Sequence, residues 1–286
     1  MDKADCEKIA NFIKEDVDTY FESTLDQEHR AHLGASVIGE PCSRKLWYQF
    51  RNAVPNEIKA TAKQTVGQKA RIFERGHREE EYIFAYLEVL GFKFKATKED
   101  QIRISDCGGH FGGSMDNICL LPPKFGLDDD VLVEIKTING QDFDKLKKDG
   151  VKLFQPKHWA QICTYGYKYG LKFCLYVSVN KNTEELHIEF LILDWELGKI
   201  MIAKANAIIQ SPVPLPKISL SPSHFSCKWC NFLNVCHYGE VMQKNCKTCV
   251  NSVPIDDAKW GCKLYQVIVP EDVVKKGCEK FEAIRS

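Results

Sequence analysis

The segments Gly112-Gly-Ser-Met-Asp116 and Val131-Leu-Val-Glu-Ile-Lys-Thr137 bound the stretch around which the chain is organised. In the second segment every other residue is apolar, which is the period of a strand with one buried face. This alternation places Glu134 and Lys136 side by side on one face. Asp116 belongs to an apolar run that predicts the neighbouring strand, so its carboxylate is expected nearby. Two carboxylates beside an ammonium group predict a divalent-cation site with a cation over a phosphate.

Composition indicates a soluble globular protein. The chain has 286 residues, 44% of them hydrophobic, which is enough for one sizeable core and an accessory lobe or two. No apolar run approaches the roughly 18 residues of a membrane span, and the N-terminus lacks the apolar block of a signal peptide. We therefore expect a cytoplasmic protein without membrane contacts. Lysine plus arginine (39) balance aspartate plus glutamate (39), so nucleic-acid binding would need a local basic patch.

Apolar periodicity predicts the elements of an α/β sandwich. Helices are expected over residues 2–22, 43–51, 69–90, 156–169 and 194–209, with Asp194 as a cap. The core candidates of the third helix are Ile72, Phe73, Ile83, Phe84 and Leu87. Strands are expected over residues 92–96, 101–104, 111–121, 131–138, 173–180 and 185–193. The polar stretch 52–68 predicts a connection, and the proline-rich residues 211–216 predict a stiff linker.

Four motifs occur in the order of a known nuclease family. They are Gly76-His77, Asp116, Glu134-Ile135-Lys136 and Gln161-Ile-Cys-Thr-Tyr165. With them the chain resembles the PD-(D/E)XK nuclease superfamily, in its RecB/AddB-like branch with the iron–sulfur CRISPR-associated exonucleases. Met115 stands where the superfamily name has proline. Over residues 34–238, the resemblance implies a restriction-endonuclease-like core, a mixed sheet flanked by helices.

The chemistry of each motif residue suits phosphodiester hydrolysis. Asp116 and Glu134 offer hard oxygen ligands to Mg²⁺ or Mn²⁺, and the carbonyl of Ile135 is a further candidate ligand. His77 is a softer ligand that suits Mn²⁺ at least as well. Lys136 is expected to orient the attacking water and to stabilise charge on the phosphorus. Gln161 and Tyr165, four residues apart on one helix face, could hold a phosphate or support Lys136.

Each motif alone has a simpler interpretation. A Glu-x-Lys pair on a strand is usually a solvated face, and a lone helical histidine is usually a surface residue. Gly108-Gly109 and Gly112-Gly113 indicate turns or bulges, or places where the backbone approaches DNA. The occurrence of all the motifs in order favours a nuclease site.

A first cysteine set combines Cys42 with Cys227, Cys230 and Cys236. Four thiolates can hold either a [4Fe–4S] cluster or a structural zinc, and the spacing does not separate the two. The resemblance favours the cluster, because in the iron–sulfur nucleases one cysteine before the core and three after it clamp the domain. His224 and His237 are less favoured ligands.

A second cysteine set, Cys246, Cys249, Cys262 and Cys278, lies in a short tail. A tail with so few apolar residues needs a staple to fold, which favours Zn²⁺ over free thiols. The other cysteines, Cys6, Cys107, Cys119, Cys163 and Cys174, are expected to be ordinary small side chains. The chain thus divides into an N-terminal helical region (1–68), a nuclease core (69–210), an iron–sulfur segment (211–238) and a zinc-binding tail (239–286). The N-terminal region and the iron–sulfur segment are expected to form one helical lobe that the cluster clamps together.

The predicted partner is DNA, as a single strand or as duplex ends. Basic side chains that could track phosphates are Arg44, Lys45, Arg71, Arg75, Arg78, Lys145, Lys147, Lys148, Lys152 and Lys157, each by itself better explained as a solvated charge. Trp47, Tyr48, Phe154 and Trp159 could stack bases, although burial is favoured for most of them. We expect a metal-dependent exonuclease of recombination, repair or phage DNA processing. The alternatives are a structure-specific endonuclease and a non-catalytic DNA-binding scaffold. No Walker motif is present, so a helicase activity would come from a partner chain.

Overall fold

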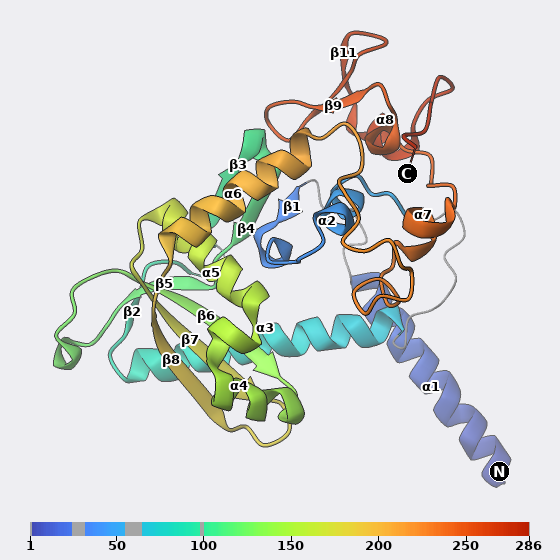
Figure 1. The fold of residues 1–286 in the computed structure, drawn as a ribbon. Coiled ribbons are helices and arrows are strands. Elements are labelled where there is room, and N and C mark those ends of the chain that lie inside the picture. Colours follow the sequence, from blue (N-terminus) through green and yellow to red (C-terminus); the bar gives the residue numbers. More distant parts are fainter. Residues whose placement is uncertain (1, 25–31, 55–64, 98–99, 286) are drawn as a thin grey trace.

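The computed structural model describes residues 2–24, 32–54, 65–97 and 100–285 (Figure 1). Part of the connection predicted over residues 52–68 lies outside this range. Every residue proposed above for a catalytic or metal site lies within it. None of the described helices combines the length and the apolar character that a bilayer crossing requires.

A five-stranded mixed sheet, here called the central sheet, lies at the lower left of Figure 1. Its order is β2 (Lys93–Phe94), β5 (Asn117–Leu120), β6 (Val131–Ile138), β7 (Phe173–Asn180) and β8 (Leu186–Ile192). Among the four strand pairs described in this sheet, only β6–β7 is parallel. Because a parallel pair needs a crossover, the chain passes between these strands through α4 (Gly140–Phe154) and α5 (Pro156–Tyr169). The mixed sheet with flanking helices agrees with the fold class expected from the sequence.

Both faces of this sheet are covered. On one face, Val133 and Ile135 of β6 pack with Ile83 and Leu87 of α3 (Val66–Val89). On the other, Leu132 packs in the core that α4 and α5 share. The expectation of a strand with one buried face was wrong: β6 is buried on both faces, and Glu134 is fully buried on the face that α5 covers.

The predicted strand 111–121 is two strands in two sheets. Its first part, β4 (Phe111–Ser114), lies between β1 (Leu33–Gly34) and β3 (Arg103–Asp106) in a small sheet. Its second part is β5 of the central sheet. The chain turns from one sheet to the other at Met115-Asp116, and the Met115 side chain is fully buried. Asp116 therefore lies at a bend between two sheets and not within a strand.

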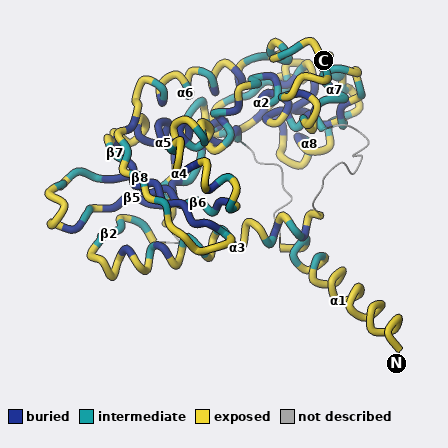
Figure 2. The backbone as a smooth tube through the Cα atoms, turned by 60° about the horizontal axis from the view of Figure 1, so that its bottom comes forward, coloured by how far each residue is buried: buried dark blue, intermediate teal, exposed yellow. Residues whose placement is uncertain are grey.

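The helices largely follow the sequence prediction. Cys42 is the N-cap of α2 (Ser43–Phe50), and Asp194 caps α6 (Trp195–Gln210) by accepting a hydrogen bond from Leu197 N at 3.0 Å. The predicted helix 2–22 is α1 (Lys3–Thr24), which has no buried residue and projects from the body (Figures 1 and 2). Helix α4 was not predicted. Ile72 and Phe73 were wrongly expected in the core, because both are exposed where α3 extends past the sheet.

The C-terminal part adds a small antiparallel sheet. It consists of β9 (Ser252–Pro254), β10 (Trp260–Cys262) and β11 (Val267–Val269), with β10 in the middle. Helix α7 (Leu233–Tyr238) precedes this sheet in the chain and α8 (Glu271–Lys276) follows it, and short 3-10 helices occur at Ala35–Val37, Cys107–Gly109, Pro123–Phe125 and Cys246–Thr248. Trp260, Val269 and Val274 belong to the same core as α2 and α5. The tail therefore packs onto the body.

Candidate active site

Asp116, Glu134 and Lys136 meet where the β5–β6 ladder ends. Asp116 Oδ2 accepts a hydrogen bond from Ile135 N at 2.7 Å, so the carboxylate continues the ladder beyond Asn117. Lys136 Nζ lies 2.6 Å from Glu134 Oε1 and 3.9 Å from Asp116 Oδ2, and it donates to the carbonyl oxygen of Ile135 at 3.1 Å. The three charged side chains and the carbonyl proposed from the sequence are thus neighbours.

Burial and the neighbouring charges together set the pKa values of Glu134 and Lys136. Burial raises the pKa of Glu134, Lys136 opposes the rise, and Asp116 adds to it. Burial also lowers the pKa of Lys136, but the two nearby carboxylates more than reverse this effect, so the pKa of the lysine ends above its usual range. Lys136 therefore remains an ammonium group at neutral pH. Its side chain is 25% exposed, which leaves it accessible to a ligand.

The donor set suits a hard divalent cation. Neither carboxylate oxygen of Glu134 accepts a hydrogen bond of regular geometry within the described part of the chain. No three His, Cys, Asp or Glu side chains in that part are placed to hold one ion. The available protein donors are therefore two carboxylates and the Ile135 carbonyl, with water in the remaining positions, as is usual for Mg²⁺.

Helix α3 also brings a charged side chain near the site that the sequence analysis did not single out. His77 is exposed, and the described residues give it no contact with Asp116 or Glu134. Glu80, three residues further along, is among the groups whose charge raises the pKa of Glu134. Glu80 lies on the face of α3 that carries Ile83, about 40° around the helix from Gly76. The amphipathic pattern of α3 contained this signal, because Glu80 shares the face of the buried residues.

Gln161 and Tyr165 support the bend that carries Asp116. Both side chains are buried. Gln161 Nε2 donates to Tyr165 Oη at 3.3 Å, and Tyr165 Oη donates to the carbonyl of Ser114 at 2.9 Å. A Cβ atom on Gly113 would lie 2.6 Å from Tyr165 Oη, so this glycine leaves room for the tyrosine. The pair therefore fixes the β4–β5 turn from the α5 side.

Sequence reasoning missed Tyr176 and His158. Tyr176 is the β7 partner of Glu134 in the parallel register, and its hydroxyl lies 2.7 Å from His158 Nδ1. Burial and then the charge of Lys136 lower the pKa of His158 to about 4. The imidazole is therefore neutral at pH 7, and its Nδ1 shares a hydrogen bond with the tyrosine hydroxyl. Only the pairing of β6 with β7, which the sequence does not show, brings these residues together.

The first cysteine set shares one cavity despite its spread in the sequence, although no three of its thiols are placed to hold one ion in the described part of the chain. Cys42, Cys227, Cys230 and Cys236 line one cavity of about 20 Å³. Burial raises the pKa of Cys227, and the nearby Cys42 and Cys236 raise it further. The other lining residues include Arg44, Lys45 and Lys217 and no acid. The thiols and cations together suit a ligand of negative charge.

The second cysteine set also shares a cavity, again with no three thiols placed to hold one ion among the described residues. Cys246, Cys249, Cys262 and Cys278 line a cavity of about 120 Å³. Burial and then Cys278, Cys249 and Cys262 raise the pKa of Cys246 to about 11. The four positions come from a 3-10 helix and the residue after it, the end of β10 and the turn after α8. All thirteen cysteines of the chain are free thiols.

Most of the basic residues proposed for DNA have partners within the protein. Lys45 and Lys157 both pair with Glu40, Arg71 pairs with Asp18, and Arg75 and Lys147 pair with glutamates of the β7–β8 turn. Arg44 is buried against Tyr48 and the linker carbonyls. Trp47, Tyr48 and Trp159 are core residues, which confirms the favoured interpretation of these aromatics.

Comparison with known proteins gives weak structural matches only. No protein-family model and no curated protein matches the chain. The structure of SSO0001 matches with 14% identity over 80% of this chain and 96% of that one, at a TM-score of 0.43. The alkaline exonuclease LHK-Exo from Laribacter hongkongensis matches with 19% identity over 63% and 87%, at 0.43. Its complex with dAMP matches with 19% identity over 62% and 86%, at 0.42. At these identities and TM-scores the matches leave the family of the chain open.

Proposed function

We propose that this chain is a metal-dependent deoxyribonuclease of the exonuclease type, which hydrolyses phosphodiester bonds. The observation that carries the proposal is the buried Glu134, whose oxygens lack regular hydrogen bonds, beside Lys136 and Asp116 at a sheet end. A buried carboxylate whose oxygens lack regular hydrogen bonds is costly even beside a lysine, and a bound cation would satisfy it. The motif order of the PD-(D/E)XK nucleases agrees with this assignment.

The side chains have distinct roles in the proposed reaction. Asp116, Glu134 and the Ile135 carbonyl would hold Mg²⁺ or Mn²⁺, which when bound supplies Lewis acidity and lowers the pKa of water. Lys136 donates to a phosphate oxygen and orients water through its ammonium group. Tyr165 and Gln161 keep Asp116 in place through the Ser114 carbonyl. His77 stays a proposed ligand for the metal, since α3 runs beside the site.

Two substitutions test the nuclease assignment. Asp116→Asn keeps an acceptor for Ile135 N but removes the charge, and Lys136→Ala removes the ammonium group. We expect each to lower hydrolysis of end-labelled linear DNA in Mg²⁺ or Mn²⁺ by about 10²-fold or more. Lys172→Ala, on an exposed lysine, is the control. Full activity in both site variants, with circular dichroism unchanged, would overturn the assignment. Digestion of a closed circle by the wild type would indicate an endonuclease.

We further propose that the first cysteine set holds a [4Fe–4S] cluster and the second a structural Zn²⁺. The acid-free lining of the first cavity suits a cluster, whose thiolate-bound form is anionic. The short strands around the thiols of the tail support the zinc assignment. Thiolate ligation needs a reducing compartment, so we place the protein in the cytoplasm. We also propose the division of the chain into the four parts given above. A helicase or a recombination protein is the proposed protein partner.

Metal analysis tests both assignments. Protein purified without air is expected to be brown and to contain about four iron atoms and one zinc per chain. Cys230→Ser should remove the colour and the iron and leave the zinc. Cys249→Ser should remove the zinc and leave the colour and the iron. Cys6→Ser, on an exposed cysteine of α1, is the control. A colourless protein with two zinc ions would contradict the cluster.

A further inference from the structure

Residues 211–239 have an unusual charge composition. The whole chain balances 39 basic against 39 acidic residues, yet this segment contains no aspartate or glutamate. Its charged residues are Lys217 and Lys228, with His224 and His237 beside them. A surface without acids in an otherwise neutral protein attracts anions through its local field.

The same segment exposes large aromatic side chains. Phe225 and Trp229 are each 77% exposed, and Tyr238 is 65% exposed. Lys228 and Trp229 are the two residues between Cys227 and Cys230, whose thiols line the cavity, so they project outward. Lys228 Nζ lies 5.5 Å from the centre of the Trp229 ring. An exposed indole with a cation over one face therefore stands on the outside of the cysteine turn.

This surface connects to the active site through one loop. A Cβ on Gly39 would lie 2.6 Å from Lys157 Cα, so residues 38–42 pack on the start of α5. Glu40 Oε2 joins the two sides, with Lys45 Nζ at 2.7 Å and Lys157 Nζ at 2.8 Å. Lys157 precedes His158, which contacts Tyr176 beside Glu134, and Lys45 lines the same cavity as Lys217.

We propose that residues 217–238 form a binding surface for unpaired DNA. Bases stack on Phe225 and Trp229, and phosphates contact Lys217 and Lys228. The proposal rests on the proposed nuclease function for the identity of the polymer. An aromatic face has a partner in a single strand, whose bases are free to unstack, but not in a duplex, whose bases already stack on each other. The absence of acids adds charge complementarity to the phosphate backbone.

Binding of end-labelled oligothymidylate, measured by fluorescence anisotropy in the Asp116→Asn background with Mg²⁺, tests this surface. The double variant Phe225→Ala/Trp229→Ala is expected to raise Kd at least about tenfold. Trp229→Phe, which keeps a stacking ring, should bind nearly as the parent does. Tyr265→Ala removes a tail aromatic of 54% exposure and is the matched control. Lys217→Glu/Lys228→Glu should reduce the slope of log K against log salt by about 1.4.

The outcomes separate this surface from the nuclease assignment. An unchanged Kd in the double alanine variant overturns the surface, and an equal loss for a hairpin duplex overturns its preference for unpaired DNA. If the alanine variant fails to fold by circular dichroism, the lysine variant decides, and an unchanged salt slope then overturns the proposal. DNA hydrolysis that persists in both Asp116→Asn and Lys136→Ala refutes the nuclease function and leaves the binding result valid.

Discussion

At the residue scale, Glu134 is a buried carboxylate in an energetically unfavourable environment. Its side chain is fully buried and its oxygens lack regular hydrogen bonds in the described structure. Removing a carboxylate from water costs several kcal/mol even when a cation is close. Lys136, at 2.6 Å, offsets part of that cost. A cation that binds both carboxylate oxygens of Glu134 should therefore stabilise the folded state.

Divalent metal is accordingly expected to raise the melting temperature. At a metal concentration about 100-fold above Kd, binding stabilises the native state by about 2.7 kcal/mol, which corresponds to several degrees in Tm. Glu134→Gln should abolish this rise, because the amide cannot replace the carboxylate as a ligand. Glu196→Gln, on the exposed first turn of α6, should keep it. Differential scanning calorimetry of metal-free protein with and without Mn²⁺ measures the effect, and an undiminished rise in Glu134→Gln contradicts it.

The sequence contained the acidic part of the site but not its surroundings. Strand alternation places Glu134 and Lys136 on one face whatever the tertiary fold, so their proximity was predictable. Tyr176 reaches Glu134 only through the parallel register of β6 with β7, which no local pattern encodes. The orientation of His77 depends on the rotation of α3, and one residue along a helix turns a side chain by about 100°.

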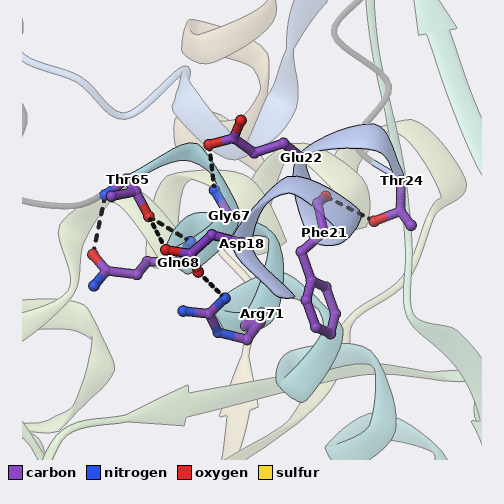
Figure 3. Close-up of polar contacts among 8 residues, drawn as sticks. All are labelled: Asp18, Phe21, Glu22, Thr24, Thr65, Gly67, Gln68 and Arg71. Atoms are coloured by element: carbon purple, nitrogen blue, oxygen red, sulfur yellow. Dashed lines mark hydrogen bonds and ion pairs between the residues drawn. The ribbon is translucent and has the colours of Figure 1, made fainter. Parts of the chain in front are cut away.

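At the element scale, the last turns of α1 contact the start of α3 (Figure 3). Thr65 and Gln68 form a capping box at the start of α3, and Thr65 Oγ1 also donates to Asp18 at 3.4 Å. Arg71 forms an ion pair with Asp18. A Cβ on Gly67 would lie 2.5 Å from the carbonyl oxygen of Asp18, so the two helices touch through this glycine. The contact needs a residue without a side chain.

Gly67→Ala is therefore expected to loosen α1 from α3. The new methyl group meets backbone, which cannot move aside, and such overpacking costs about 1–3 kcal/mol. Tryptic cleavage at Lys8 and Lys14 of α1 should become faster. Gly76→Ala is the matched control on the same helix, because a Cβ there meets nothing within 4 Å; it should stabilise α3 by up to about 1 kcal/mol. Equal cleavage rates in the two variants would contradict the proposed contact.

Elements were predictable where their own pattern was sufficient. The apolar period and the caps located α1, α2, α3, α5 and α6 to within a few residues. The division of residues 111–121 was hidden, because a continuous apolar run does not show where a chain passes from one sheet to another. Helix α4 was missed because lysines and acids separate its buried residues, Phe143, Leu146 and Val151.

At the scale of the whole molecule, Arg51 joins the tail to the body. Its side chain is 1% exposed, and its guanidinium lies 5.4 Å from the Trp47 ring and 5.0 Å from the Trp260 ring. It donates to the carbonyls of Ser211 and Lys247, each at 3.1 Å. One side chain thus connects α2, the linker and the tail.

Glycines and a histidine complete this attachment. A Cβ on Gly108 or Gly109 would lie 2.8 Å from Asp256 Oδ1 or from Ala258 N, so this turn faces the tail and not DNA. His110 Nε2 lies 2.8 Å from the carbonyl of Ile255. None of these long-range contacts was predictable, because each joins residues more than a hundred positions apart. The sequence showed a tail with its own thiols, whereas the structure shows a tail that shares the main core.

Arg51→Met should therefore uncouple the tail from the body. Methionine retains apolar volume between Trp47 and Trp260 but leaves the carbonyls of Ser211 and Lys247 buried without their donor, at a cost of about 2–5 kcal/mol. Urea unfolding followed by tryptophan fluorescence should show a lower midpoint than in the wild type. Hydrogen exchange should become faster than in the wild type, and this increase should be larger in residues 246–284 than in β6 and β7. Arg103→Met, on an exposed arginine of β3, is the control. If Arg51→Met keeps the wild-type midpoint and the wild-type exchange in the tail, the attachment depends on the apolar contacts of Trp260 and not on the buried guanidinium.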